Sequence, residues 1–282
     1  EEEEEEEEEG HSRAICGHSQ EMARGRDSTQ PGAGLCQPRL APVLPLVLVR
    51  GLPRSAHVHF GPLRVINVDR VVPGAGSGTH GYRDMEILSY VLEGDLADKD
   101  STGTSSTIRP GDVQRMSAGS GVQHSEFNGS QQQPARFLQI WILPNVVGIP
   151  AGYEETRFGE AEQRGRLCLI ASPGGVQGSV HIHQDAQVYA GLFDGPEQGQ
   201  LQVARGRLIW IHVACARIVA NGEVLEAGDA LKLTGEPELR LGSGEAAAVI
   251  VFDLPAGADW LLRSTRVVRT RSRRRRNHHR RT

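Results

Sequence analysis

The chain has 282 residues, a formal net charge of −4 and 38% hydrophobic residues, enough for one large or two ordinary globular domains. Its 35 acidic residues fall to 26 without the glutamate run 1–9, and its 31 basic residues fall to 21 without the ten arginines from Arg263 onward. The body is therefore mildly acidic, which argues against specific nucleic-acid binding. The four cysteines form no Cys-x-x-Cys pair, so neither a disulfide framework nor a zinc site is indicated.

The N-terminal segment 1–55 carries glycine, proline, serine and glutamine without a sustained period, and we expect it to be a disordered extension. Its most apolar stretch, 40–53, is too short and too rich in proline to span a membrane. Glutamates stand where a signal peptide would carry basic residues, so we expect a cytoplasmic protein that does not bind membranes. At the other end, residues 259–282 form an arginine-rich tail, expected to be solvated.

From residue 56 the pattern becomes that of β-structure. Stretches rich in valine and isoleucine end at clusters of glycine, proline, aspartate and serine: FGPLRVINVDRVV, EILSYVLEGDLADKD, STIRPGDVQRMSAG and PARFLQIWILP. Short strands at this spacing predict an all-β sandwich or barrel, which we place at residues 56–145. Helices should be few and short.

A second unit of the same kind is expected at residues 179–258, with SVHIHQDAQVYAGLF, RLIWIHVACARIVANGEVLEAGDALKLTG and AAAVIVFDLP. Its fragment LEAGDALKL resembles IRPGDVQRM in the first unit, because in both an apolar residue leads through x-Gly-Asp into a strand. This similarity indicates an internal duplication of one β-barrel unit. The segment 146–178, rich in proline and glycine, is expected to link the two units.

Two pairs of polar residues in the first unit point to chemistry. His80 and Tyr82 are two positions apart, and so are His124 and Glu126. Side chains at i and i+2 of a strand share a face, so two adjacent strands could bring both imidazoles and one carboxylate to a common point. Such a set suits a non-haem Fe(II) that keeps positions open for dioxygen and a substrate.

The spacing of these residues resembles that of the two motifs of the cupin superfamily. The matching positions are His80, Tyr82, Glu86 and Gly94 in the first motif, and Gly111, His124 and Asn128 in the second. More narrowly, the chain resembles bacterial quercetinase-like pirins in GPLRVINVDRVVPGAGSGTH, RDMEILSYVLEG, IRPGDVQRMSAGSGVQHSEFN and FLQIWILP. The resemblance covers residues 57–255. It implies a bicupin, in which two jelly-roll-like β-barrels pack face to face and only the first holds a metal.

The resemblance also implies four metal-ligand positions: His80, Tyr82, His124 and Glu126. This chain departs from the family at Tyr82, where relatives carry a histidine. Three ligands still suffice for Fe(II) in other folds, whereas a neutral phenol is a poor ligand. A phenolate on Fe(III) and a tyrosine that only fills space are the alternatives. Iron is the expected metal, and Mn, Co, Ni and Cu accept the same kind of ligands.

The activity implied by the resemblance is that of a metal-dependent dioxygenase, which cleaves a flavonol such as quercetin with O2. Glu126 would be the catalytic residue, accepting the proton of the flavonol 3-hydroxyl group as a general base. The alternative is a non-catalytic binding or regulatory protein with a degraded metal site and a protein partner. A bicupin holds two cupin units in one chain, so the protein can be a monomer.

Other histidines and acids have a simpler interpretation. The remaining His-x-His pairs are His57 with His59 and His181 with His183. The first lies at a strand start of the family pattern, and the second lies in the barrel that holds no metal in relatives. His212 is expected to be a hydrogen-bonded strand residue. Glu86, a ligand in the general cupin pattern, is a candidate replacement ligand or partner of a ligand.

Overall fold

The structure, a computed structural model, describes residues 60–101, 103, 105–256 and 268–270. The extension 1–55, the pair His57 and His59, and most of the arginine-rich tail lie outside these ranges. Within them the chain consists mainly of β-strands, with one short helix, α1(Glu160–Gln163), and one 3-10 segment, η1(Pro173–Gly178). Neither helix is long and apolar enough to cross a membrane. The prediction of an all-β protein with few, short helices is confirmed.

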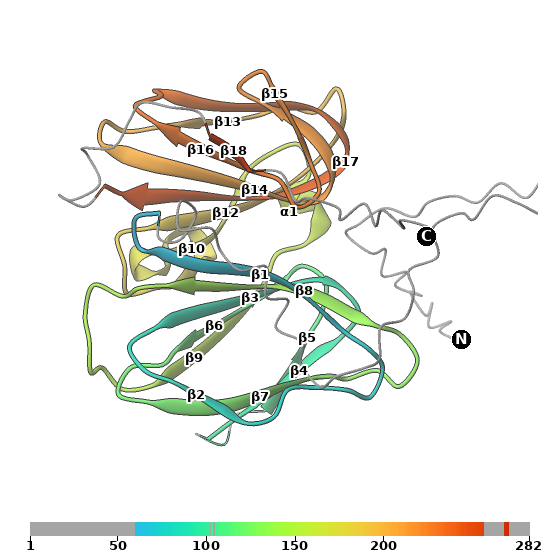
Figure 1. The fold of residues 1–282 in the computed structure, drawn as a ribbon, viewed down its shortest axis with the longest axis vertical. Helices are drawn as coiled ribbons and strands as arrows, with labels where there is room; N and C mark the ends of the chain where they lie inside the picture. Colours follow the sequence, from blue (N-terminus) through green and yellow to red (C-terminus); the bar gives the residue numbers. More distant parts are fainter. Residues whose placement is uncertain (1–59, 102, 104, 257–267, 271–282) are drawn as a thin grey trace, which may run out of the picture.

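Two antiparallel sheets form the first barrel (Figure 1). The larger sheet contains, in the order of pairing, β1(Leu63–Val71), β8(Ala135–Ile142), β3(Glu86–Glu93), β6(Asp112–Ser117) and β9(Gly152–Arg157). The smaller sheet contains β2(His80–Tyr82), β7(Val122–Asn128), β4(Leu96–Asp100) and β5(Ser105–Ile108). The edge strand β9 comes from the segment expected to link the barrels, so part of that segment completes the first one.

The second barrel is one sheet stacked against the first unit (Figure 1). Its main path runs β11(Val180–His181), β10(Cys168–Ser172), β12(Gln187–Gly195), β17(Glu238–Pro255), β14(Arg207–Ala220), β16(Ala230–Thr234) and β18(Val268–Thr270). Two shorter strands, β13(Gly199–Gln202) and β15(Glu223–Glu226), pair with β17 and β14. Strand β18 belongs to the segment expected to be a solvated tail, yet it pairs with β16.

The Gly-Asp fragments noted in both halves form the same turn. Asp112 Oδ2 accepts a hydrogen bond from the backbone N–H three residues before it, at 2.7 Å, and Asp229 Oδ2 does the same at 3.1 Å. The preceding residues Gly111 and Gly228 have φ of 89° and 86°, a conformation that glycine adopts without strain. A carboxylate that closes the turn and a glycine that permits it therefore introduce β6 and β16 alike.

Strand β3 is buried on both of its faces. All seven residues from Glu86 to Leu92 are buried, which a strand with one solvent face would not show. One set of alternate side chains joins a core shared by both barrels: Leu88, Tyr90 and Leu92 with Ile170, Val188 and Phe252. The other set, including Ile87 and Val91, packs within the first barrel. This strand therefore connects the barrel interior to the contact between the barrels.

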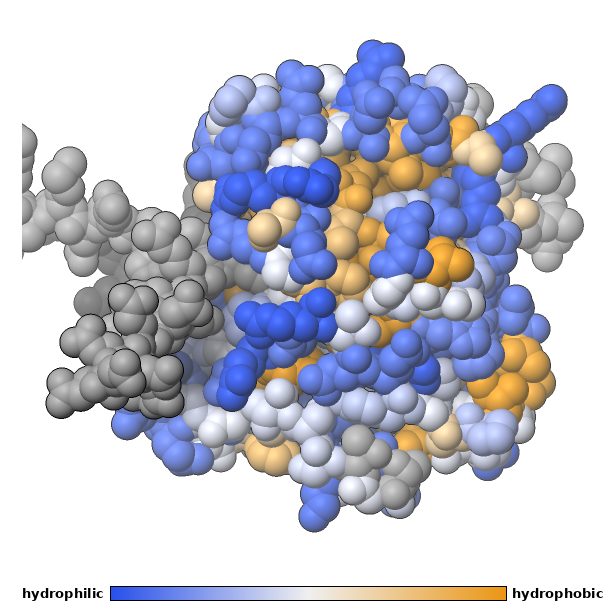
Figure 2. Space-filling view, turned by 180° about the vertical axis from the view of Figure 1, so that it is seen from behind, coloured by the Kyte–Doolittle hydropathy of each residue, from blue (hydrophilic) through white to orange (hydrophobic). Residues whose placement is uncertain are grey.

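The outer surface is mostly polar. Figure 2 shows hydrophilic side chains over most of one face, with apolar surface between them. Among the described residues, the large hydrophobic side chains that are exposed are Val68, Phe127, Val146, Val147 and Val176. Scattered exposed side chains of this kind are normal on a globular protein.

His212 in β14 is a strand residue as predicted, but its Nε2 atom has no hydrogen-bond partner. Burial, followed by the positive charge of Arg136, lowers the pKa of His212 from 6.5 to about 4. The unfolded chain therefore binds more protons than the folded one between these values, so stability is lost as the pH falls through this window. We expect the change from pH 7.5 to pH 5 to cost about 2 kcal/mol through this residue.

Chemical denaturation of wild type and His212→Gln at both pH values measures this effect. The variant should lose less stability on acidification, because it no longer carries the titrating ring. Trp210→Phe is the matched control, since Trp210 lies two residues away on β14 and its Nε1 atom also lacks a partner. Equal pH dependence in wild type and His212→Gln would show that His212 does not titrate in this way.

Candidate metal centre in the first barrel

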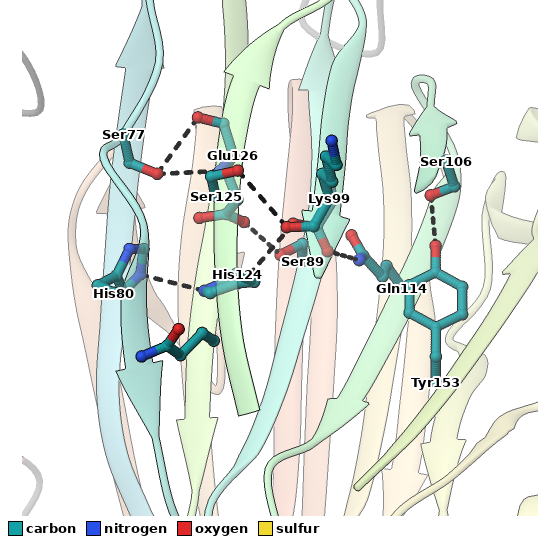
Figure 3. A network of polar contacts seen from close by, with 12 residues as sticks. Ser77, His80, Ser89, Lys99, Ser106, Gln114, His124, Ser125, Glu126 and Tyr153 are labelled. Carbon is teal, nitrogen blue, oxygen red and sulfur yellow. Dashed lines mark hydrogen bonds and ion pairs between the residues drawn. The ribbon is translucent and has the colours of Figure 1, made fainter. Parts of the chain in front are cut away.

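Two histidines face each other across adjacent strands inside the first barrel. His80 in β2 and His124 in β7 are direct cross-strand partners in the antiparallel register. Their Nε2 atoms lie 3.1 Å apart and their ring centroids 4.5 Å apart. Figure 3 shows the two rings pointing toward each other. The structure therefore brings together two of the residues predicted to bind a metal.

The other nitrogen of each ring is held by an oxygen. His80 Nδ1 lies 2.9 Å from the carbonyl oxygen of Gly78, and His124 Nδ1 lies 3.2 Å from Oδ1 of Asp98. Carbonyl and carboxylate oxygens accept hydrogen bonds, so each Nδ1 carries the hydrogen. In the neutral rings both Nε2 atoms then present lone pairs to each other, with no hydrogen between them. The contact is favourable only if a positive charge, a proton or a metal ion, joins the two nitrogens.

The geometry of this pair fits a metal ion. Two metal–nitrogen bonds of about 2.1 Å at a right angle place the nitrogens about 3 Å apart, and the Nε2 atoms here are separated by 3.1 Å. The surroundings also favour positive charge. Burial by itself lowers the pKa of His124, but the hydrogen bond to Asp98 and the charges of Glu126, Asp98 and Asp100 outweigh it, so the pKa is raised.

Glu126 lies on the same face of β7 as His124, because the two residues are two positions apart. Its side chain is buried, and its Oε1 accepts a hydrogen bond from Ser89 Oγ at 3.2 Å (Figure 3). Its Oε2 accepts one from Gln139 Nε2 at 2.5 Å. Trp141 Nε1 donates to Gln139 Oε1 at 3.1 Å, which orients that amide. Burial raises the pKa of Glu126 to about 7, so this carboxyl group can exchange a proton near neutral pH.

Further carboxylates make this part of the barrel negative. Asp98 in β4 lies directly opposite Glu126, and Asp100 lies directly opposite His124; both aspartates are buried. Two carboxylates at directly opposed positions repel each other. In β1, burial raises the pKa of Asp69 to about 6. A bound cation would offset this concentration of negative charge.

Tyr82, one of the four positions expected to bind the metal, packs against the two imidazoles. Its ring centroid lies 5.2 Å from that of His80, 5.4 Å from that of His124 and 5.1 Å from that of Trp141. Burial, together with the negative charges of Glu126 and Asp69, raises the pKa of Tyr82 far above its ordinary value. Without a bound metal the hydroxyl group therefore stays protonated and Tyr82 fills space beside the imidazoles.

A complete three-ligand set is not assembled in this structure. Among the residues it describes, no three His, Cys, Asp or Glu side chains converge as ligands of one metal ion. The imidazoles of His80 and His124 meet, whereas the oxygens of Glu126 point to Ser89 and Gln139. Each of these oxygens accepts one hydrogen bond and keeps a second lone pair, so Glu126 could complete a set of two histidines and one carboxylate if one of them turned toward the metal.

Glu86, the candidate replacement ligand, lies elsewhere. Its Oε2 accepts a hydrogen bond from Ser117 Oγ at 2.9 Å, and its Oε1 lies 3.3 Å from His183 Nδ1 in the second barrel. It therefore takes part in the contact between the barrels. The reason is its position on β3, where Glu86 has the same parity as Leu88 and so faces the second barrel.

Sequence reasoning missed three residues that hold the site: Asp98, Ser89 and Gln139. Each lies on a strand other than β7, and its contact depends on how the strands pair, so no local motif connects it to Glu126 or His124. One signal was present for Asp98. Asp98 and Asp100 are two positions apart on β4, so their side chains share a face. Two buried acids on one face inside a barrel suggest a cation nearby.

Comparison with known proteins decides the family. Residues 53–142 match the family model described as Pirin, and residues 169–254 match that of the quercetinase C-terminal cupin domain. A protein of Escherichia coli (strain K12) named quercetin 2,3-dioxygenase is 38% identical over 196 residues, covering 70% of this chain and 84% of the relative. The chain belongs to the pirin family. The predictions of family and of a bicupin fold are thereby confirmed.

Solved pirin structures agree with this assignment. The crystal structure of YhhW from Escherichia coli has a TM-score of 0.67 and 38% identity to this pirin, covering 70% of this chain and 83% of that one. The structure of bacterial pirin YhhW in complex with nickel(II) has a TM-score of 0.69 and 36% identity, covering 73% and 88%. At least one relative with this fold therefore binds a transition metal.

Proposed function

We propose that this pirin is a metal-dependent dioxygenase that opens the ring of a flavonol such as quercetin with dioxygen. The observation that carries the proposal is the pair of facing Nε2 atoms of His80 and His124, 3.1 Å apart, whose Nδ1 atoms are both engaged by oxygens. The name of the Escherichia coli relative supports the same activity. His80, His124 and Glu126 would hold the metal, with iron as the first candidate and nickel, Mn, Co and Cu as others.

When bound, the metal would supply Lewis acidity toward the substrate oxygens and electron transfer toward dioxygen. Glu126 accepts the proton of the flavonol 3-hydroxyl group as a general base. Its pKa, about 7 without a metal, is lowered by a bound cation, so the carboxylate is ionised at neutral pH. Ser89 and Gln139 hold the carboxyl group in place during this transfer. Tyr82 and Trp141, which pack edge to face beside the imidazoles, offer aromatic surface to a flat ring.

The first experiment is elemental analysis of purified wild type, Tyr82→His and Tyr82→Phe. We expect wild type to carry about one metal ion per chain, with two histidines and one carboxylate as ligands. Tyr82→His should bind metal more tightly, because it adds a neutral imidazole at a ligand position. Tyr82→Phe is the matched control and should bind like wild type, since the protonated phenol is not a ligand. The element found distinguishes iron from nickel.

Two results would count against this assignment. If wild type and Tyr82→His both stay empty after incubation with Fe(II) and with Ni(II), the centre is not a metal site. If Tyr82→Phe loses metal that wild type retains, Tyr82 is itself a ligand. Where metal is present, consumption of dioxygen with quercetin tests the reaction.

A second candidate function is a binding or regulatory protein without catalysis. Tyr82 at a ligand position, and the oxygens of Glu126 turned toward Ser89 and Gln139, favour this alternative. It predicts a protein that binds metal weakly or not at all and consumes no dioxygen with quercetin. Wild type that carries a full metal ion and turns over quercetin would exclude it.

A further inference from the structure

We propose that Asp98 is the positioning residue that fixes the tautomer of His124, holding the hydrogen on Nδ1 and leaving the lone pair on Nε2. Asp98 Oδ1 lies 3.2 Å from His124 Nδ1, and both residues are buried, with 3% and 2% of their surface exposed. The functional consequence rests on the proposed function, in which His124 Nε2 binds a metal. The tautomer itself does not depend on it.

Asp98 is in turn held by Gln114. Gln114 Nε2 in β6 donates to the second oxygen of Asp98, Oδ2, at 2.6 Å (Figure 3). Each oxygen of the carboxylate therefore has its own donor. The Oε1 atom of Gln114 is buried without a partner, although an unsatisfied acceptor of this kind is costly. The amide thus keeps its donor on Asp98 at the expense of its own oxygen, which indicates that the carboxylate must be oriented.

The strand register explains how Asp98 reaches His124. Asp98 lies opposite Glu126, and His124 lies opposite Asp100, so Asp98 and His124 are diagonal neighbours across β4 and β7. Diagonal positions on one face of a sheet are within reach of long side chains and rings. A carboxylate at position 98 can therefore hold the outer nitrogen of the ring while the inner nitrogen faces His80.

The chemical reason for such a residue is that neutral imidazole has only one N–H group. If the hydrogen moved to Nε2, that atom could no longer bind a metal. Partners that hold the outer nitrogen of a metal-binding histidine typically account for 10- to 100-fold in metal affinity. A purely stabilising ion pair would also explain the contact between Asp98 and His124, so the test must read the tautomer directly.

The tautomer is read from long-range ¹H–¹⁵N correlation spectra of the metal-free protein, at a pH where His124 is neutral. In wild type we expect the Nδ1–H form of His124. In Asp98→Ala the acceptor is gone, and we expect the Nε2–H form, which can donate to Nε2 of His80. In Asp98→Asn the side-chain oxygen can still accept, so the Nδ1–H form should persist. Gln114 can turn its free Oε1 toward the new amide group.

Metal affinity is the second readout, measured with Ni²⁺ alone against a chelator of known strength. Asp98→Ala should bind about 10- to 100-fold more weakly than wild type, and Asp98→Asn should lose less. Asp112→Asn is the matched control. Asp112 is another buried aspartate of the first barrel, but its carboxylate closes the Gly-Asp turn and does not contact His124. Its affinity and its His124 tautomer should equal those of wild type.

The outcomes separate this inference from the proposed function. An Nε2–H form in wild type, or an unchanged Nδ1–H form in Asp98→Ala, would overturn the positioning role. If Asp98→Ala does not fold, wild type and Asp98→Asn still decide, because loss of the Nδ1–H form in either contradicts the inference. If the tautomers are as expected but no variant binds Ni²⁺ or Fe²⁺, Asp98 keeps its role and the metal centre fails.

Discussion

Replacing Glu126 by glutamine is expected to lower kcat for quercetin by about 100- to 10,000-fold, the usual contribution of a positioned general base. Glutamine keeps the size of the side chain and its contact with Ser89, but it cannot accept the substrate proton. The measurement is dioxygen consumption by protein whose metal content has been determined, so that a loss of metal is not mistaken for a loss of the base.

Glu93→Gln is the matched control for this experiment. Glu93 is a partly exposed carboxylate at the end of β3, near Arg136, and has no contact with the site. Its pairing with Arg136 at 3.5 Å is of the kind that contributes at most about 1 kcal/mol to stability. Full turnover by metal-containing Glu126→Gln would show that another group takes the proton.

Truncating Phe252 to alanine is expected to lower the free energy of unfolding by about 3–5 kcal/mol. Its ring is fully buried in β17 and belongs to the core shared by the two barrels. Removal leaves a cavity that the rigid strands on both sides cannot fill. Equilibrium denaturation in urea measures the loss, with intrinsic tryptophan fluorescence as one probe and circular dichroism as the other.

Val147→Ala provides the comparison, because Val147 is 69% exposed and should change stability by less than about 0.5 kcal/mol. A loss below about 1 kcal/mol for Phe252→Ala would mean that the barrels do not share a tightly packed core. Separate transitions for the two probes would mean that unfolding is not a single cooperative step.

Much of the fold could be predicted because the strands are short, apolar and bounded by turn residues. The Gly-Asp fragments are the clearest case, since glycine with positive φ and a carboxylate closing the turn are local chemistry that recurs in both halves. Pairing between distant strands was not predictable. Nothing in the segment 146–178 indicates that β9 would pair with β6 and complete the first barrel.

The site was predictable in part for the same reason. His124 and Glu126 share a face because they are two positions apart on one strand. That His80 stands opposite His124 depends on the register of β2 and β7, which no local pattern specifies. Glu86 illustrates the opposite error. Motif spacing suggested that Glu86 is a metal ligand or the partner of one. On β3, however, the residue that contacts Glu126 is Ser89, three positions later. Residues three positions apart on a strand face opposite sides, so Glu86 points away from the site.

The double burial of β3 has a consequence for mutational tolerance. In a strand with one wet face, every second position accepts polar or charged replacements, so a scan of all substitutions shows a period of two. From Glu86 to Leu92 no position has solvent to accept such a replacement. Alternate positions are instead constrained by two different requirements: the chemistry inside the first barrel and the packing between the two barrels. Variation in this strand would therefore be constrained at every residue, even in a descendant that had lost all catalysis.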